Sequence, residues 1–241
     1  TISVCGHPHT APEAKRRLGF MSESPYVYRH LSGREYLRFC GELLDLPRTG
    51  MEARIAAVLD EVGMASRADR GLGTYSKGMQ QRIGLAQALL GDPELLILDE
   101  PMSGLDPLGR RDVRDIILAR AAAGATLFFS SHIIPDVEAL CDRVAIVVDG
   151  SLRAIGRVDE LLERDPVSYE LTFTGAAVDG LATPLEGSHE RSDATWVRVA
   201  TPHRDALLTE LEGRGARLLS LNPVRISLED LLVEHSEEPA S

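Results

Sequence analysis

Two neighbouring segments of this sequence carry residue types that suit chemistry on a phosphate chain. The first, residues 75–90, reads YSKGMQQRIGLAQALL and places Ser76 where a helix would begin. The free backbone N–H groups and the positive dipole end of such a helix start suit it to binding an anion. The second, residues 95–101, reads LLILDEP and is an apolar strand that ends in two carboxylates, Asp99 and Glu100. Together the two segments predict a site for a nucleoside triphosphate.

Three side chains are predicted to meet at one edge of a sheet, because ligands of open α/β sheets bind at the carboxyl ends of strands. We expect Asp99 to hold Mg²⁺ through water, since this hard cation prefers oxygen ligands. We expect Glu100 to orient or deprotonate an attacking water. His132 follows the next predicted strand, in the run FFSSH, and should reach the terminal phosphate. Taken singly, an Asp-Glu pair or a histidine at a strand end is more often structural.

Gly78 lies in the first turn of the predicted helix, where a glycine costs up to about 1 kcal/mol relative to alanine. Close approach of a phosphate would explain it, and the alternative is an ordinary capped helix that tolerates it. His7 and His9 could suggest a metal pair, but no third ligand accompanies them, which favours surface residues.

The phosphate-cradling pattern G-x-x-x-x-G-K-[ST] does not occur in these residues. The pattern needs a lysine after a glycine, whereas the two lysines, Lys15 and Lys77, follow Ala14 and Ser76. The sequence also opens on Thr1 rather than on a methionine. We therefore expect that it is cut from a longer protein.

The composition is that of an ordinary globular protein, with 241 residues, of which 44% are hydrophobic and 26% charged. A net charge of −11 and scattered basic residues disfavour nucleic-acid binding. No apolar run approaches the roughly 20 residues needed to cross a bilayer, and no signal peptide is visible. The three cysteines form no C-x-x-C pair, which favours reduced thiols in a cytosolic protein.

Apolar strands alternate with helices as far as about residue 163, which predicts a mostly parallel α/β sheet. The predicted strands are 1–5, 17–21, 95–98, 125–129, 143–148 and 151–155, with 95–98 covered on both faces. The predicted helices are 33–44, 51–62, the helix from Ser76 with Met79, Ile83, Ala86 and Leu90 on one face, and a helix capped by Asp106 with Pro107 first and Val113, Ile116, Ile117 and Ala121 inward.

The dipeptide Asp165-Pro166 marks a predicted boundary. Beyond it, alternation at 167–173 and 197–199 predicts half-buried strands, and helices are predicted after Pro202 and from Ser227, where Ser-Leu-Glu-Asp resembles a capping box. Residues 164–233 are therefore expected to form a small α+β extension without a catalytic constellation, with loop at 174–194. We expect residues 234–241 to be disordered.

In combination, these motifs resemble the nucleotide-binding subunit of ABC transporters over residues 1 to about 163. The run YSKGMQQR corresponds to that family's LSGGQ signature, LLILDE to its Walker B strand with the catalytic glutamate, and SGLD (residues 103–106) to its D-loop. His132 corresponds to the switch histidine, and residues 20–23 match the Q-loop region, with Glu23 where most members have glutamine. The order of the motifs makes the resemblance specific.

This resemblance implies a partial P-loop NTPase (RecA-like) fold without its Walker A loop, and a helical signature subdomain at about residues 24–92. It implies ATP and Mg²⁺ as cofactors, an integral membrane permease as partner, and a second ATPase subunit, identical or not, bound head to tail. It implies no nucleic acid, and a place on the cytoplasmic face of the cell membrane. The extension resembles that of export-type members whose permease is a separate polypeptide.

Roles for further residues also follow from the resemblance. The D-loop residue Asp106 would cross the interface between two subunits, and Glu23 would approach the metal and the nucleotide. Glu23 could bind the metal more strongly than a glutamine, or report occupancy less freely. The residues implied to contact a nucleotide held by the other subunit are Ser76, Lys77, Gly78, Met79 and Gln80, of which Lys77 and Met79 depart from the family's usual glycine and glutamine.

Other interpretations remain open. The chain could be a non-catalytic module that supplies only its signature face to a competent partner. The C-terminal lobe of an SMC-type chromosome ATPase is disfavoured by the upstream Q-loop match and by the lack of heptads and positive charge. A soluble ribosome-associated ABC factor is disfavoured by the acidic balance and the single cassette. We expect the 241 residues to be inactive alone and the intact parent to hydrolyse ATP to power transport of an unknown substrate.

Overall fold

The computed structural model describes residues 1–25, 27–162, 166–191, 193–225 and 227–230. The chain packs as two compact units, Thr1–Asp136 and Val137–Ser241. The predicted boundary near residue 163 stays a prediction, and both Asp165 and the predicted disordered tail at 234–241 lie outside the described residues. Within the described ranges, no helix combines the length and the apolar character needed to cross a membrane.

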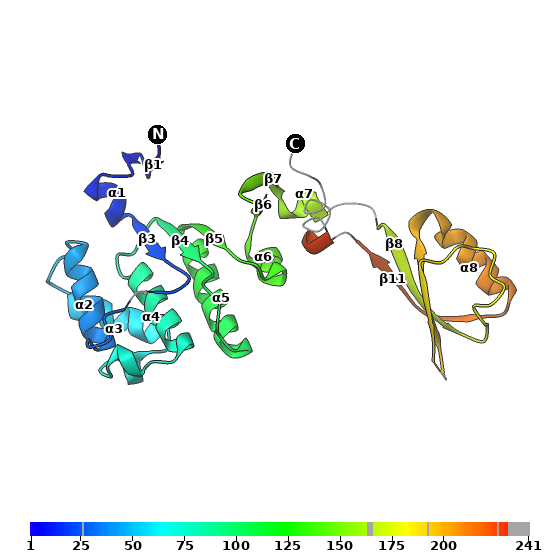
Figure 1. Cartoon of the computed structure of the whole chain (residues 1–241), viewed down its shortest axis with the longest axis horizontal. Coiled ribbons are helices and arrows are strands. Elements are labelled where there is room, and N and C mark those ends of the chain that lie inside the picture. The colour runs from blue at the N-terminus through cyan, green and yellow to red at the C-terminus, as the bar shows by residue number, and fades with distance from the viewer. Residues whose placement is uncertain (26, 163–165, 192, 226, 231–241) are drawn as a thin grey trace. The chain divides into compact units, whose positions relative to one another are not determined.

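A three-stranded parallel sheet forms the centre of the first unit (Figure 1). Strand β4 (Leu95–Asp99) lies between β3 (Leu18–Met21) and β5 (Thr126–Ser130) and is parallel to both. The register pairs Asp99, the last residue of β4, with Ser130, the last residue of β5. This sheet confirms the predicted parallel α/β fold and brings two strand ends to one edge.

One face of this sheet is buried and the other is partly open. On the buried face Met21 and Leu98 are each 1% exposed, whereas Phe20 and Phe128, on the opposite face, are 51% and 66% exposed. Leu95 and Ile97, the residues of β4 on that face, are half-buried, so the prediction that strand 95–98 is covered on both faces holds fully for one face and in part for the other within the described residues. The apolar run alone could not reveal this, because both faces of β4 are equally apolar.

Helix α4 (Lys77–Leu89) covers the buried face and lies directly on the backbone of β3. A Cβ atom added at Gly19 would lie 2.2 Å from the carbonyl oxygen of Ala88. In the middle of the helix, a Cβ added at Gly84 would lie 2.5 Å from the Cγ atom of Pro25, in the segment after β3. Two glycines thus allow the closest contacts of α4 with its neighbours.

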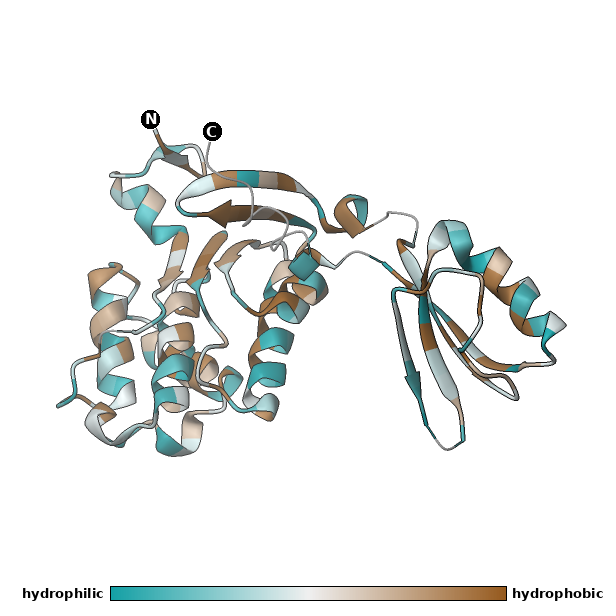
Figure 2. Cartoon of the chain, turned by 45° about the vertical axis from the view of Figure 1, so that its right-hand side comes forward, coloured by the Kyte–Doolittle hydropathy of each residue, from teal (hydrophilic) through white to brown (hydrophobic). Residues whose placement is uncertain are grey.

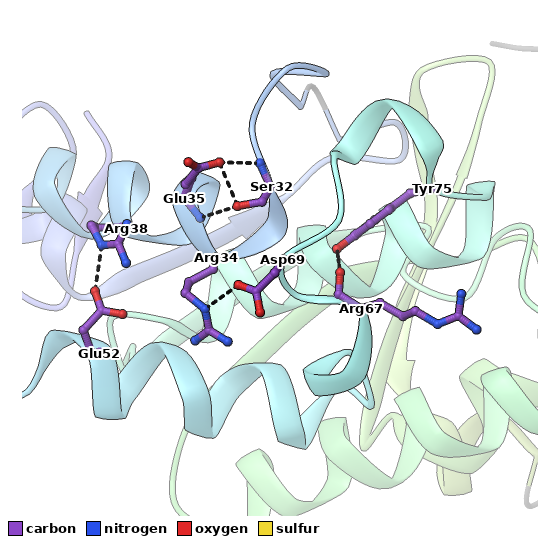
Figure 3. A network of polar contacts seen from close by, with 8 residues as sticks. All are labelled: Ser32, Arg34, Glu35, Arg38, Glu52, Arg67, Asp69 and Tyr75. Carbon is purple, nitrogen blue, oxygen red and sulfur yellow. Dashed lines mark hydrogen bonds and ion pairs between the residues drawn. The ribbon is translucent and has the colours of Figure 1, made fainter.

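Helices α2 (Gly33–Leu43) and α3 (Met51–Glu61) confirm the predicted helices at 33–44 and 51–62. A capping box starts α2: the Ser32 hydroxyl accepts the Glu35 N–H at 3.3 Å, and the Glu35 carboxylate accepts the Ser32 N–H at 2.8 Å (Figure 3). In Figure 2 these helices carry both apolar and polar residues, as expected for helices packed on one side.

Two ion pairs tie α2 to other parts of the same unit (Figure 3). Arg34 Nε lies 2.8 Å from an oxygen of Asp69, and Arg38 Nε lies 2.7 Å from an oxygen of Glu52 in α3. Each pair raises the pKa of its guanidinium and lowers the pKa of its carboxyl, chiefly through the side-chain hydrogen bond. These exposed pairs orient α2 and contribute little stability individually.

The remaining elements of the first unit differ from prediction in two places. Residues 1–5 do not form one strand: β1 (Ser3–Val4) pairs antiparallel with β2 (His7–Pro8), before helix α1 (Pro12–Arg16). Helix α5 (Pro107–Ala122) buries Val113, Ile116 and Ile117 as predicted, but Ala121 is exposed because it lies in the final turn of the helix, beside other exposed alanines.

The second unit contains a hairpin and a small α+β module. Helix α6 (Ile134–Leu140), which begins at the end of the first unit, leads to β6 (Arg143–Val148). Strand β6 pairs antiparallel with β7 (Ser151–Arg157), before helix α7 (Val158–Leu162). The turn between the strands has positive φ at Asp149 and Gly150, 51° and 75°. This is the left-handed geometry that the predicted Asp-Gly turn requires.

Four antiparallel strands form the sheet of the α+β module in the order β11–β8–β10–β9. They are β8 (Ser168–Thr174), β9 (Gly187–Glu190), β10 (Thr195–Ala200) and β11 (Arg217–Val224), with helix α8 (Arg204–Gly213) on one face. Strand β9 corrects the prediction of loop at 174–194; its residues are mostly exposed, so they show no apolar alternation. The core residues are Leu171, Phe173, Val197, Val199, Leu207 and Leu211.

Candidate active site

The end of β4 turns sharply at Glu100. Its φ of 47° is in the left-handed region, a conformation that costs a non-glycine residue about 1–3 kcal/mol and persists only where the surroundings hold it. This turn sets the Glu100 side chain apart from that of Asp99, the last residue of the strand. The contacts around this peptide therefore decide where the carboxylate points.

Ser130, at the end of β5, joins the two acidic residues. Its hydroxyl donates to Oδ1 of Asp99 at 2.6 Å and accepts the backbone N–H of Glu100 at 3.1 Å. The hydroxyl therefore orients one carboxylate through its side chain and the other through its backbone. Sequence reasoning missed Ser130, although it lies in the FFSSH run that pointed to His132.

His132 contacts Glu100 twice. An Oε1 atom of Glu100 accepts the backbone N–H of His132 at 2.9 Å and lies 2.9 Å from Nδ1 of the imidazole. The Glu100 side chain is 17% exposed and the His132 side chain 73%. When Nδ1 carries the proton and donates to the carboxylate, the other ring nitrogen of a neutral imidazole is left to accept. The structure thus brings these two predicted residues into contact. The Glu100 carboxylate is half-buried and the His132 imidazole is exposed.

The backbone carbonyl of Glu100 is held by two donors. Gln81, a buried residue of α4 that is 1% exposed, donates from Nε2 at 2.9 Å, and the N–H of Ser103 donates at 3.0 Å. Sequence reasoning also missed Gln81. The sequence shows only a glutamine with Gly84 and Leu85 one turn on, which does not distinguish it from an exposed helix residue.

The start of α4 is built as predicted around Ser76. Its hydroxyl accepts the N–H of Met79 at 3.3 Å, and this N-cap leaves the remaining N–H groups of the first turn free of helical partners. The preceding residue, Tyr75, is buried and donates its hydroxyl to the carbonyl of Arg67 at 2.6 Å (Figure 3). Burial raises the pKa of the Tyr75 hydroxyl, so it stays a neutral donor that fixes the entry into the helix.

The D-loop residues 103–106 border the start of α4. The Lys77 side chain crosses Gly104 so closely that a Cβ there would lie 2.7 Å from Lys77 Cδ, and Lys77 Nζ lies 3.5 Å from the Ser103 hydroxyl. A surface cavity of about 510 Å³ opens between the two segments. Its lining residues are Ser76, Lys77, Gly78, Met79, Arg82, Gly104, Leu105 and Asp106.

Two of the predicted binding residues use their side chains in bonds within the fold. The Gln80 amide turns back and donates to the carbonyl of Tyr75 at 3.2 Å. The Asp106 carboxylate accepts the N–H of Gly109 at 2.8 Å and caps α5, as predicted. Roles of these two residues toward a ligand stay predictions.

The carboxylates at the end of β4 are suitable ligands for Mg²⁺ of the kind that enzymes acting on phosphates use. Within the described residues, no three His, Cys, Asp or Glu side chains gather to hold a metal. Mg²⁺ usually keeps several waters and takes one or two carboxylates plus phosphate oxygens, so Asp99 with its Ser130 partner fits. Glu23 is exposed two residues beyond β3 and stays a predicted ligand.

Comparison with known proteins gives the following similarities. The family model for ABC transporters matches residues 1–103. An uncharacterized ABC transporter ATP-binding protein of Synechocystis sp. is 40% identical over 98% of this chain and 67% of its own length. The fluoroquinolones export ATP-binding protein of Mycobacterium tuberculosis is 44% identical over 62% of this chain and 48% of its own length. A solved ATP binding subunit of an ABC transporter superposes with a TM-score of 0.61 and 30% identity, covering 67% of this chain and 68% of that one.

Proposed function

This chain belongs to the family of ABC transporter ATP-binding subunits, and we propose that it hydrolyses ATP to drive transport through a separate membrane permease. The observation that carries the proposal is the cluster at the ends of β4 and β5, where Glu100 contacts His132 and Ser130 contacts Asp99. A carboxylate and a metal-binding oxygen at one strand edge can position a water and a metal ion for phosphoryl transfer, and the imidazole adds a polar group beside them.

Each residue has a separate task in this proposal. Asp99 holds magnesium through water, and the bound ion would neutralise charge on the phosphates. Glu100 accepts a proton from the attacking water, and its contact with the His132 backbone N–H keeps the carboxylate oriented. As an imidazolium, the exposed His132 ring would donate from Nδ1 to Glu100 and from Nε2 to the terminal phosphate. Glu23 reaches the metal or its waters from the segment after β3.

The start of α4 binds the nucleotide of a second subunit. Ser76, Lys77 and Gly78 line the cavity beside the D-loop, and free N–H groups of a helix start favour phosphate there. Two subunits, identical or not, then enclose ATP head to tail, with Asp106 at their interface. Met79 lines the same cavity, whereas the Gln80 amide stabilises the start of α4 through its hydrogen bond to the Tyr75 carbonyl.

ATP binding also needs a phosphate loop, which these 241 residues do not contain. A hydrogen bond to a charged phosphate contributes about 1.5–3 kcal/mol, so losing about four of them removes about 6–12 kcal/mol. Micromolar binding amounts to about 8 kcal/mol. We expect no micromolar binding of magnesium-ATP by residues 1–241 alone. Calorimetric titration checks this, and micromolar binding would contradict it.

Transport itself belongs to the complex. We propose that residues 23–34 transmit the closing and opening of the two ATPase subunits to an integral membrane permease, so the chain acts at the cytoplasmic face of the cell membrane. The name of the Mycobacterium tuberculosis relative supports export as the direction. The permease selects the cargo, and no nucleic acid takes part.

A second candidate is a non-catalytic module that lends only its signature face to a competent subunit, and the cavity lined by Ser76, Lys77 and Gly78 is the surface that it would supply. One experiment separates the two. In the complex purified with its permease, Glu100→Gln should reduce the ATPase rate by about 10²–10⁴-fold while leaving nucleotide binding intact. The matched control is Glu94→Gln, at an exposed carboxylate just before β4 that pairs with Arg17. If Glu100→Gln hydrolyses ATP as fast as the control, the non-catalytic module is the better description.

A further inference from the structure

Gln81 is the one glutamine of α4 that is almost fully buried, and its amide reaches the chain segment that carries the proposed base. It is 1% exposed, and its Nε2 lies 2.9 Å from the carbonyl oxygen of Glu100. Burying an amide is costly unless it is hydrogen-bonded, and an apolar side chain of the same length would fill this space at no such cost. Packing alone therefore does not account for a glutamine here.

The bond acts on a backbone that needs holding. Glu100 has a left-handed φ of 47°, a conformation that persists only where neighbours over-determine it. Ser130 accepts the Glu100 N–H, and Ser103 donates to the same carbonyl as Gln81. Of these three, Gln81 alone comes from α4.

Gln81 lies between the start of α4 and the turn at Glu100. In the proposed function these two parts of the subunit act on different nucleotides. Helix α4 begins beside Ser76, five residues before Gln81, and its start faces the cavity shared with the D-loop. The carbonyl that Gln81 holds also anchors Ser103, the first D-loop residue. A shift of α4 therefore acts directly on the peptide that orients the Glu100 carboxylate.

We infer that Gln81 is a positioning residue, which transmits the placement of the signature helix to the catalytic carboxylate of the same subunit through the Glu100 carbonyl. The inference rests on the proposed function. Gln81 itself touches neither nucleotide nor metal, since its side chain is buried behind the turn. Its loss should lower the rate of the chemical step and leave nucleotide affinity unchanged.

The test is Gln81→Met, which keeps the length of the side chain and removes the donor. The matched control is Gln87→Met on the same helix, whose amide donates to the carbonyl of Phe20 in β3 at 3.4 Å. In the complex with its permease, Gln81→Met should lower kcat about tenfold or more, with KM for ATP changed less than about twofold. Gln87→Met should leave both constants near the wild-type values.

Hydrogen exchange gives a second measurement that needs no activity. The backbone N–H groups of residues 99–105, apart from Pro101, should exchange about tenfold faster in Gln81→Met than in Gln87→Met, because one anchor of the Glu100 peptide is gone. Gln81→Leu serves as a second variant if the methionine protein does not fold.

The outcomes separate the inference from the function on which it rests. Unchanged exchange at 99–105, or faster exchange with an unchanged kcat, would overturn the positioning role of Gln81. A wild-type complex without ATPase activity would count against the proposed function instead, and the exchange comparison would still decide whether Gln81 holds Glu100.

Discussion

At the scale of single residues, the acidic end of β4 depends on neighbours that carry no charge. Ser130 and Gln81 together hold the side chain of Asp99 and both backbone groups of Glu100. Neither the Ser130 hydroxyl nor the Gln81 amide could catalyse phosphoryl transfer itself. Their contribution is to reduce the number of orientations that the carboxylates can adopt before a substrate arrives.

Ser130→Ala tests this dependence. We expect the ATPase rate of the complex to fall about 10–100-fold, the usual range for losing a residue that orients a metal ligand. The magnesium concentration for half-maximal rate should rise, since Asp99 loses its 2.6 Å donor. Ser131→Ala is the control, because the Ser131 hydroxyl only accepts the N–H of Ile133 at 3.0 Å. Equal ATPase rates for the two alanine variants would show that Ser130 does not orient Asp99 for catalysis.

Sequence patterns predicted the charged residues of the site better than their helpers. Asp99, Glu100 and His132 follow apolar runs, so their place at one sheet edge could be predicted from strand ends alone. Gln81 and Ser130 could not, because their partners lie 19 and 30 residues away and the bonds go to backbone groups of Glu100. Any residue with a donor near the Glu100 carbonyl, or with an acceptor near the Glu100 N–H, could make the same bond.

At the scale of elements, α4 packs closely against its neighbours because glycine has no Cβ atom at the points of contact. We expect Gly84→Ala to destabilise the first unit by about 1–3 kcal/mol through overpacking, since its Cβ would lie 2.5 Å from Pro25 Cγ. The better helix propensity of alanine offsets at most about 1 kcal/mol. Urea unfolding measures the difference. Gly213→Ala in α8 is the control, because nothing lies within 4 Å of a Cβ there, and it should be neutral or slightly stabilising.

The start of α2 should make the first unit sensitive to acid. Hydrogen bonds from Ser32 lower the pKa of Glu35 below its ordinary 4.5, and those from Arg38 and Arg34 lower the pKa of Glu52 and Asp69. A carboxyl with a lowered pKa in the folded state stabilises the fold above its ordinary pKa. This stability is lost as the pH falls below about 4.5 through the lowered value.

Glu35→Gln checks this assignment. The glutamine can still cap α2 but no longer titrates, so the loss of stability between about pH 4.5 and 3 should be shallower than in the wild type. Denaturant midpoints followed by circular dichroism across this range give the slope. Glu42→Gln, at an exposed position of the same helix, is expected to retain the wild-type slope. An identical slope in both variants would exclude the capping box as a source of acid sensitivity.

Elements with strong periodicity were predicted to within a few residues, and the exceptions share a physical cause. Helices α2 and α3 and strands β4 and β6 follow directly from apolar spacing. Strand β9 and the β1–β2 hairpin consist of exposed or half-buried residues. No alternation of apolar and polar residues therefore marks them in the sequence. The open face around Phe128 could not be predicted either, because burial of a strand face depends on what packs there.

At the scale of the whole molecule, the second unit has an apolar core of its own. Phe173→Ala should cost about 3–5 kcal/mol in that unit, because the ring is fully buried among Leu171, Val197 and Leu211. Peptide-resolved hydrogen exchange should then show faster exchange in β8 and β10 than in α4. Phe128→Ala, at a ring that is 66% exposed, is the matched control. Equal acceleration in the strands and in α4 would show that the chain unfolds as one.

The placement of Lys77 has a practical consequence for labelling. Besides the α-amino group, the chain has two primary amines, Lys15 and Lys77, and Lys77 is exposed beside Gly104. With Lys15→Arg, a dye attached through succinimidyl ester chemistry would mark a single side chain, next to the D-loop. Its fluorescence polarisation would follow the meeting of two subunits in real time, without an engineered cysteine.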